Sequence, residues 1–266
     1  SSGSDTGSHN FTITDDSTYE GNETIIFQTA IVSGDTEYTT ASASTTFTIN
    51  ENESAPTVTL TSSASSVAEN GSALTLTATL SGTTHEDVTV SLSTSGTGTE
   101  GTDYSNISDI TILAGDTTGT TSFTPTDDSM YEGSETGIVS IDTVSGGSAT
   151  ENGTQAVTIT ITDNESAPTV TLTSSASSIA ENSGSSLTLT ATLSGTTSED
   201  VTVSLSTSGT GTEGTDYGTV SDITISSGST TGTATLTPTD DSTYEGNETG
   251  IIAIDTVSGG SATESG

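Results

Sequence analysis

A repeat of about 112 residues constrains the fold of this chain more than any other feature of its sequence. The segment APTVTLTSSASS begins at Ala55 and begins again at Ala167. Self-similarity at a fixed period is the sequence signature of tandem structural units. The repeat therefore predicts the C-terminal part of one unit at 1–54, a complete unit at 55–166, and a unit without its last strand at 167–266.

Within each complete unit, apolar and polar residues alternate with a period of two, and Thr is the favoured outward residue. Such alternation predicts half-buried strands, with which the β-branched Thr is compatible. The strands expected in the complete unit are 57–61, 74–80, 88–93, 109–113, 121–126, 137–144 and 156–162. Seven short strands separated by Gly-, Ser-, Asn- and Asp-rich turns are typical of an immunoglobulin-like sandwich. We therefore expect an all-β chain of tandem seven-stranded β-sandwiches, arranged as beads on a string.

The charge of the chain excludes several classes of partner. There is no lysine or arginine against 36 aspartates and glutamates, and the formal net charge is −36. Nucleic-acid phosphates and anionic membrane surfaces are bound through Lys and Arg, so neither is expected as a partner. No apolar run approaches the ~18 residues of a membrane span, so no membrane insertion is expected in this segment. A hydrophobic fraction of 27% with this charge is typical of disorder, but the strict patterning and only four prolines argue against disorder.

The acids gather in loops and at strand ends. In the middle unit Asp127 and Asp128 open the loop segment DDSMYEGSE, and other acids follow the first and last predicted strands. Several loops can meet at one end of a sandwich, and converging carboxylates without an internal cation repel one another. Calcium accepts six to eight oxygen ligands from flexible loops, whereas Mg²⁺ demands a tighter octahedron. The pattern therefore indicates a Ca²⁺ site, with a solvated acidic loop as the alternative for any single acid.

The same residues carry a family resemblance. The run D-D-x-x-Y-E-G-x-E begins at Asp15, Asp127 and Asp240, and GTDY, an A-E pair after the first strand and a terminal D-N-E accompany it. Together these motifs resemble the Calx-beta domain, a calcium-binding immunoglobulin-like sandwich repeat of bacterial surface proteins and sodium–calcium exchangers. One departure is Asn164, which interrupts the closing acids, so the number of ions per domain stays open.

The resemblance implies a set of calcium ligands in each unit. In the middle unit they are Glu69, Asp103, Asp127, Asp128, Glu132, Glu135, Asp163 and Glu165, with the backbone carbonyl of Met130. In the last unit they are Glu181, Asp216, Asp240, Asp241, Glu245 and Glu248. In the first unit they are Asp15, Asp16, Glu20, Glu23 and Glu51.

Catalytic chemistry has little support in the sequence. His85 stands beside Glu86 and Asp87, but the next unit has Ser198 at the counterpart of this histidine. A catalytic role repeated in each unit is therefore absent. The chain has no cysteine, which excludes disulfides and zinc-thiolate sites. We expect no enzymatic activity.

The leading functional hypothesis is a calcium-stiffened structural region of a secreted or cell-surface protein, serving as an adhesin stalk or as a filament subunit. Its expected partners are calcium ions and neighbouring repeats, or like chains in a homopolymeric filament. Calcium at the junction between units is expected to stiffen the string. The alternatives are a calcium-sensing regulatory module, a Thr-ladder protein that binds ice or a crystalline polysaccharide, and general halophilic acidity. If open strand edges donate strands, residues 45–54 would insert into the last unit of a neighbouring chain.

Overall fold

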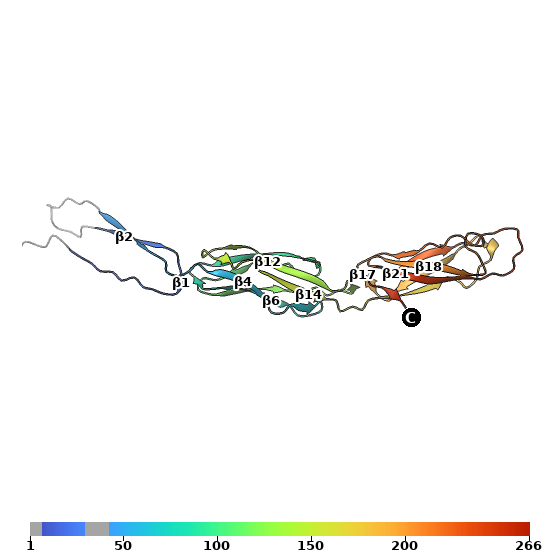
Figure 1. Cartoon of the computed structure of the whole chain (residues 1–266), viewed down its shortest axis with the longest axis horizontal. Coiled ribbons are helices and arrows are strands. Elements are labelled where there is room, and N and C mark those ends of the chain that lie inside the picture. The colour runs from blue at the N-terminus through green and yellow to red at the C-terminus, as the bar shows by residue number, and fades with distance from the viewer. Residues whose placement is uncertain (1–6, 30–42) are drawn as a thin grey trace, which may run out of the picture.

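The structure is a computed structural model that describes residues 7–29 and 43–266. Figure 1 shows an N-terminal hairpin, a middle sandwich and a last sandwich following one another in an elongated row. Nearly all regular structure is β, and the single helical turn among the described residues is η1 (Glu181–Ser183). No helix of the described part of the chain is long and apolar enough to cross a membrane. The prediction of an all-β chain of tandem sandwiches is confirmed.

Two sheets form the middle sandwich. The first has the order β10 (Thr118–Phe123), β6 (Leu74–Leu80), β4 (Thr57–Ser62) and β13 (Thr150–Glu151). The second has the order β5 (Ser66–Ala68), β14 (Ala156–Thr162), β12 (Glu135–Ser145), β8 (Val88–Gly96) and β9 (Ile110–Ile112). All seven predicted strands are present. The one expected at 121–126 runs instead from 118 to 123, because Pro125 has no N–H for a sheet ladder and joins only an isolated bridge.

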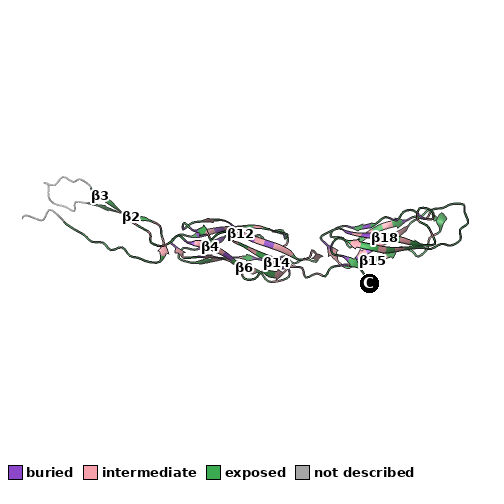
Figure 2. Ribbon diagram, in the orientation of Figure 1, coloured by how far each residue is buried: buried purple, intermediate pink, exposed green. Residues whose placement is uncertain are grey.

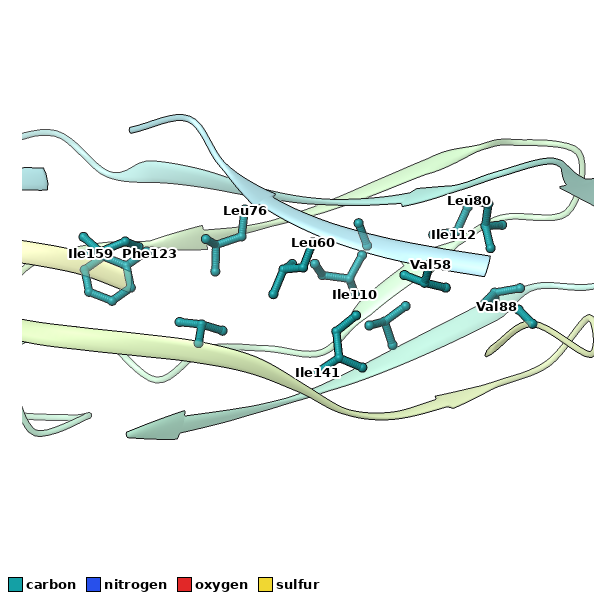
Figure 3. Close-up of a cluster of buried hydrophobic side chains, with 14 of the residues drawn as sticks. Val58, Leu60, Leu76, Leu80, Val88, Ile110, Ile112, Phe123, Ile141 and Ile159 are labelled. Atoms are coloured by element: carbon teal, nitrogen blue, oxygen red, sulfur yellow. The ribbon is translucent and has the colours of Figure 1, made fainter. Parts of the chain in front are cut away.

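The core of the middle unit lies between these two sheets. Apolar residues at alternate positions of both sheets point inward, and Figure 3 shows them meeting along the length of the sandwich. At one end Phe123 is fully buried and stacks on Tyr104 with ring centroids 4.6 Å apart. A Cβ on Gly137 would lie 2.8 Å from the Phe123 ring, so only glycine fits there. The period-two pattern thus encodes the core directly.

The last sandwich repeats this plan. Its first sheet has the order β20 (Thr231–Leu236), β16 (Leu187–Leu193), β15 (Thr169–Ser174) and β22 (Thr263–Glu264). Its second sheet has the order β19 (Ile223–Ile225), β18 (Val201–Gly209) and β21 (Gly250–Ser258). No strand of residues 167–266 takes the place that β14 has in the middle unit. A hollow of about 760 Å³ is left there, lined by Leu172, Leu187, Ile252 and Ile254 among others.

The N-terminal unit is an open structure in its described part. Strand β2 (Glu23–Gln28) pairs antiparallel with β3 (Ser44–Ile49) of the same chain. The strand-donation hypothesis for residues 45–54 is therefore wrong for this structure, because β3 pairs with β2 of its own chain. Figure 2 shows this hairpin as largely exposed, whereas the two sandwiches contain buried residues. Phe11, Phe27 and Phe47 form an aromatic cluster with centroids 5.1 to 5.8 Å apart, and each is at least 40% exposed.

Short parallel bridges join successive units. Strand β1 (Thr18–Tyr19) of the first unit pairs with β7 (Thr83–Thr84) of the middle unit. Strand β11 (Met130–Tyr131) of the middle unit pairs with β17 (Thr196–Thr197) of the last unit. These two-residue strands are too short to show any sequence alternation, and the sequence analysis did not predict them.

Candidate metal centre

Sheet pairing brings the acids of the middle unit together at one end of the sandwich. One group contains Glu69, Asp163 and Glu165, and a second contains Asp103, Glu132 and Glu135. Within each group, one ligand oxygen from each residue lies within 4.8 Å of the others. We call these six residues, together with Asp128, the acid pole.

The topology explains why residues far apart in sequence meet at the acid pole. Strand β5 runs parallel to β14, with Ala68 opposite Thr162, so Glu69 and Asp163 leave the same sheet edge side by side. The Glu69 N–H extends this ladder by donating to the Thr162 carbonyl at 3.0 Å. Glu135 begins β12 directly opposite Ile161 of β14, which places it at the same end.

Backbone N–H groups hold several of the carboxylates in place. One Asp163 oxygen, Oδ2, accepts hydrogen bonds from the Glu132 and Gly133 N–H groups, both at 2.6 Å. Its other oxygen accepts from the Glu165 N–H at 2.7 Å. Asp128 Oδ1 accepts from the Met130 N–H at 2.7 Å, and Asp103 Oδ2 accepts from the Thr99 N–H at 2.6 Å. These bonds fix the acid loops and leave the remaining carboxylate oxygens available.

Two carboxylate oxygens of the acid pole are buried without a hydrogen-bond partner. They are Glu69 Oε1 and Glu165 Oε2, and Glu69 as a whole is only 6% exposed. Burial first, and then the neighbouring Glu165, Asp163 and Asp128, raise the pKa of Glu69 to about 8. Burial and the charge of Asp103 raise the pKa of Glu135 to about 7, and the pKa of Glu132 is also raised. A buried charge is costly unless it is paired or coordinates a metal, and the chain has no lysine or arginine to pair with it.

The residues present fit a hard divalent cation. Every side-chain donor of the acid pole is a carboxylate oxygen, the ligand type of Ca²⁺ and Mg²⁺ rather than of soft metals. An ion beside Glu69 and Glu165 would satisfy both unpartnered oxygens. Among the ligands predicted from the sequence, Asp127 and Asp128 are exposed and belong to neither acid group, and Met130 lies in β11, two residues before Glu132. Their roles as ligands stay predictions.

The last unit reproduces only one of the two acid groups. Asp216, Glu245 and Glu248 come together, but both glutamates are exposed. Desolvation, and then neighbouring charges that include Glu181, raise the pKa of both glutamates, although Glu181 is not part of the group. Asp241 accepts from the Thr243 N–H at 2.6 Å, as Asp128 does in the middle unit, and Asp240 is exposed outside the group.

In the first unit the loop acids are exposed, and of its described acids only Glu51 and Glu53 are half-buried. Glu51 Oε2 accepts from the Glu20 and Gly21 N–H groups, both at 2.6 Å, and these bonds contribute to lowering the Glu51 pKa to about 2. This is the contact that Asp163 makes in the middle unit. A hollow of about 340 Å³ here is lined by Asp15, Asp16, Glu20, Glu23, Glu51 and Glu53 among others.

One acid of this group was missed by the sequence analysis. Glu53 is 112 residues before Glu165, and Glu51 raises its pKa. The repeat spacing alone would have placed Glu53 in the set, because its counterpart in the middle unit was already a predicted ligand.

The metal-free chain is expected to lose stability as the pH rises from 5 to 8.5. The pKa values of Glu69 and Glu135 rise from the ordinary 4.5 to about 8 and about 7 on folding. Their contribution to stability is therefore fully present below pH 4.5 and is lost as the pH rises through these folded values. Thermal melts in EDTA at constant ionic strength should give a melting temperature that falls across this range. A melting temperature that rises with pH in EDTA would contradict the buried acid pole.

The fold and the acid pole together define a class, that of tandem immunoglobulin-like sandwiches with carboxylates clustered at one end of the sandwich. The Calx-beta domain model matches residues 1–53, 51–165 and 163–265, and the chain belongs to the Calx-beta family. Calx-beta domains are structural or regulatory calcium-binding modules, and they occur in extracellular or membrane-associated proteins. The family resemblance stated from the sequence is thus confirmed.

Solved structures with a similar fold include calcium-binding domains of this family. CBD12 from CALX1.2 is 20% identical with a TM-score of 0.36, covering 68% of this chain and 74% of its own. The apo-form Calx CBD1 domain is 19% identical with a TM-score of 0.36, covering 41% of this chain and 98% of its own. The calcium binding domain CBD12 of CALX1.1 is 19% identical with a TM-score of 0.34, covering 66% and 73%. No curated protein matches this chain.

Proposed function

We propose that this chain is a calcium-binding structural repeat region of an extracellular or cell-surface protein, in which calcium stiffens a string of sandwiches. The observation that carries the proposal is the pair of buried, unpartnered oxygens of Glu69 and Glu165 in a chain without lysine or arginine. Because no lysine or arginine can neutralise the acid pole, its buried carboxylates must either take up protons or bind a cation from solution. Extracellular calcium is the hard divalent ion whose flexible, oxygen-rich coordination suits such loops best.

The proposed ligands in the middle unit are the seven residues of the acid pole, with Asp127 and the Met130 carbonyl as further candidates. Asp163 and Glu165 stand shortly before Pro168, where the last unit begins, and Met130 lies in the bridge to that unit. Calcium would therefore bind close to the junction between sandwiches. A stiffened junction suits a spacer, such as an adhesin stalk or a filament subunit, better than a switch.

Titration calorimetry of the EDTA-treated chain tests the proposal. We expect saturable calcium binding that the middle unit dominates, with one ion for each of its two acid groups, and weaker binding by the exposed group of the last unit. Magnesium should bind much more weakly, because it prefers a tight octahedron and keeps several waters. The double variant Glu69→Gln/Glu135→Gln should lose the tighter calcium binding, so the heat of binding assigned to the middle unit should disappear. Absence of saturable calcium binding by the parent chain would refute the proposed function.

A further inference from the structure

The two junctions of the chain are built in the same way. In the first, Thr18 lies opposite Thr83 and Tyr19 opposite Thr84. In the second, Met130 lies opposite Thr196 and Tyr131 opposite Thr197. The upstream segment always comes from the DDSxYEGxE loop, and the downstream segment is always a Thr-Thr pair. We call these two segments the loop edge and the Thr-Thr edge.

The hydrogen bonds that both junctions share end on backbone carbonyls of the upstream loop. In the first junction the His85 N–H donates to the Tyr19 carbonyl at 3.3 Å, and the Thr83 hydroxyl donates to the Ser17 carbonyl at 3.3 Å. In the second junction the matching contacts follow. The Ser198 N–H donates to the Tyr131 carbonyl at 3.2 Å, and the Thr196 hydroxyl donates to the Ser129 carbonyl at 3.1 Å.

The Thr-Thr edge is held rigidly by its own sandwich. Thr84 and Thr197 are almost completely buried, and the hydroxyl of each donates at 2.6 Å to the carbonyl two residues further on. Each also packs against a glycine, Gly147 or Gly260, where a Cβ would come within 2.8 Å of the threonine side chain. The downstream unit therefore presents a fixed edge, and the geometry of the bridge is passed on to the whole sandwich.

The loop edge is held by the acids on either side of it. Asp128 accepts from the Met130 N–H, and Asp163 accepts from the Glu132 N–H immediately after the bridge. The two buried hydrophobic clusters stay separate, one between residues 58 and 161 and the other between 170 and 262. No buried apolar cluster of the described residues spans the junction, so packing does not set the orientation.

We propose that the loop edge of each unit is a docking surface for the Thr-Thr edge of a following unit, and that this backbone bridge fixes the orientation of successive units. The specificity lies in the first threonine, whose hydroxyl reaches a loop carbonyl, and in the N–H two positions later. The bridge itself needs no metal. Its coupling to calcium, through Asp128 and Asp163, rests on the proposed function.

The last unit carries a third copy of the loop edge at Thr243–Tyr244. This segment forms no bridge within the described chain, and Tyr244 is 96% exposed, whereas Tyr19 and Tyr131 are half-buried. The proposal assigns it one occupant, the Thr-Thr edge of a further repeat of this family. The register at the other two junctions predicts that Thr243 would lie opposite the first threonine of that edge.

Pulsed electron spin resonance can measure the orientation of one unit on the next. The chain has no cysteine, so Thr120→Cys and Thr233→Cys place spin labels only at these exposed, repeat-equivalent sites. We expect a narrow distance distribution for this pair in calcium. The added change Thr196→Val/Ser198→Pro should broaden it at least twofold, while the same change at the other junction, Thr83→Val/His85→Pro, should leave it unaltered. Unaltered width in the Thr196→Val/Ser198→Pro variant would overturn the proposal.

Two further measurements separate loss of the bridge from misfolding and from loss of calcium binding. If circular dichroism shows that the proline variant does not fold, Thr196→Val alone should still broaden the distribution, and an unchanged width then refutes the proposal. If the parent chain binds no calcium but its distance distribution still broadens on loss of the bridge, only the proposed function is refuted.

A longer chain tests the unpaired loop edge at Thr243–Tyr244. In it, residues 154–266 are appended after Gly266. Labels at Thr233 and its appended copy should then reproduce the distance between 120 and 233, and any other distribution refutes that assignment.

Discussion

Removal of calcium is expected to lower the melting temperature of the middle unit by at least about 10 °C at pH 8, which is the effect of one of its two proposed sites. At a calcium concentration 100-fold above Kd, one site adds about 2.7 kcal/mol to the free energy of unfolding. For a domain of about 112 residues, each kcal/mol shifts the melting temperature by about 4 °C. The effect is large because calcium replaces the repulsion within the acid pole by coordination of the buried Glu69 and Glu165 oxygens.

The measurement is a pair of thermal melts, one in calcium and one in EDTA, followed by circular dichroism. Magnesium and sodium chloride at matched ionic strength are the controls, because general screening of 36 acids would also stabilise the chain. Calcium should exceed both controls. Melting curves that coincide in calcium and in EDTA would show that the acid pole holds no ion that matters for folding.

The substitution Glu69→Gln is expected to have opposite effects in the two media. In calcium it should lower the melting temperature and weaken binding by about tenfold or more, because a charged ligand is lost from the site. In EDTA at pH 9 it should raise the melting temperature, because it removes a buried carboxylate whose pKa is raised to about 8. Glutamine keeps the size of the side chain, so packing changes little.

The matched control is Glu181→Gln. The repeat makes Glu181 the counterpart of Glu69, but Glu181 is exposed at the start of η1 and lies outside the acid group of its unit. Glu181→Gln should shift the melting temperature, in calcium and in EDTA, by only a small fraction of the shift caused by Glu69→Gln. A Glu69→Gln chain that shifts in the same direction with and without calcium would contradict metal coordination by this residue.

Much of the fold follows from local features of the sequence. The alternation of apolar residues located seven strands of the middle unit, because a period of two directly states which side chains face the core, but it missed the short strands β5 and β13. The strand near Phe123 was misplaced by three residues, since the alternation TSFTPT continues through Pro125 although proline cannot continue the ladder. The two-residue bridges β1–β7 and β11–β17 went unpredicted, because nothing local distinguishes them from a turn.

The acid pole was predictable in outline and not in detail. The repeated loop and the strand-end acids pointed to one end of the sandwich, and six of the predicted acids form the two groups of the middle unit. Asp127 and Asp128 are both exposed and in neither group. Asp128 differs in that it accepts a hydrogen bond from the Met130 N–H and contributes to raising the pKa of the buried Glu69. The sequence context of two adjacent aspartates does not distinguish them. Glu53 was missed because the family motif was followed instead of the repeat.

By itself, the sequence determined the repeat, the strand pattern, the absence of any internal cation and the recurrence of acids at loops. These are properties of single residues and their spacing along the chain. Only the tertiary structure decided that Glu69 and Glu165 share a buried site, that β3 pairs within its own chain, and that the acid loops of the first and middle units also form the bridges to the next unit. The reason is physical. Burial and pairing depend on the register of strands distant in sequence, and that register is set by the packing of the whole sandwich.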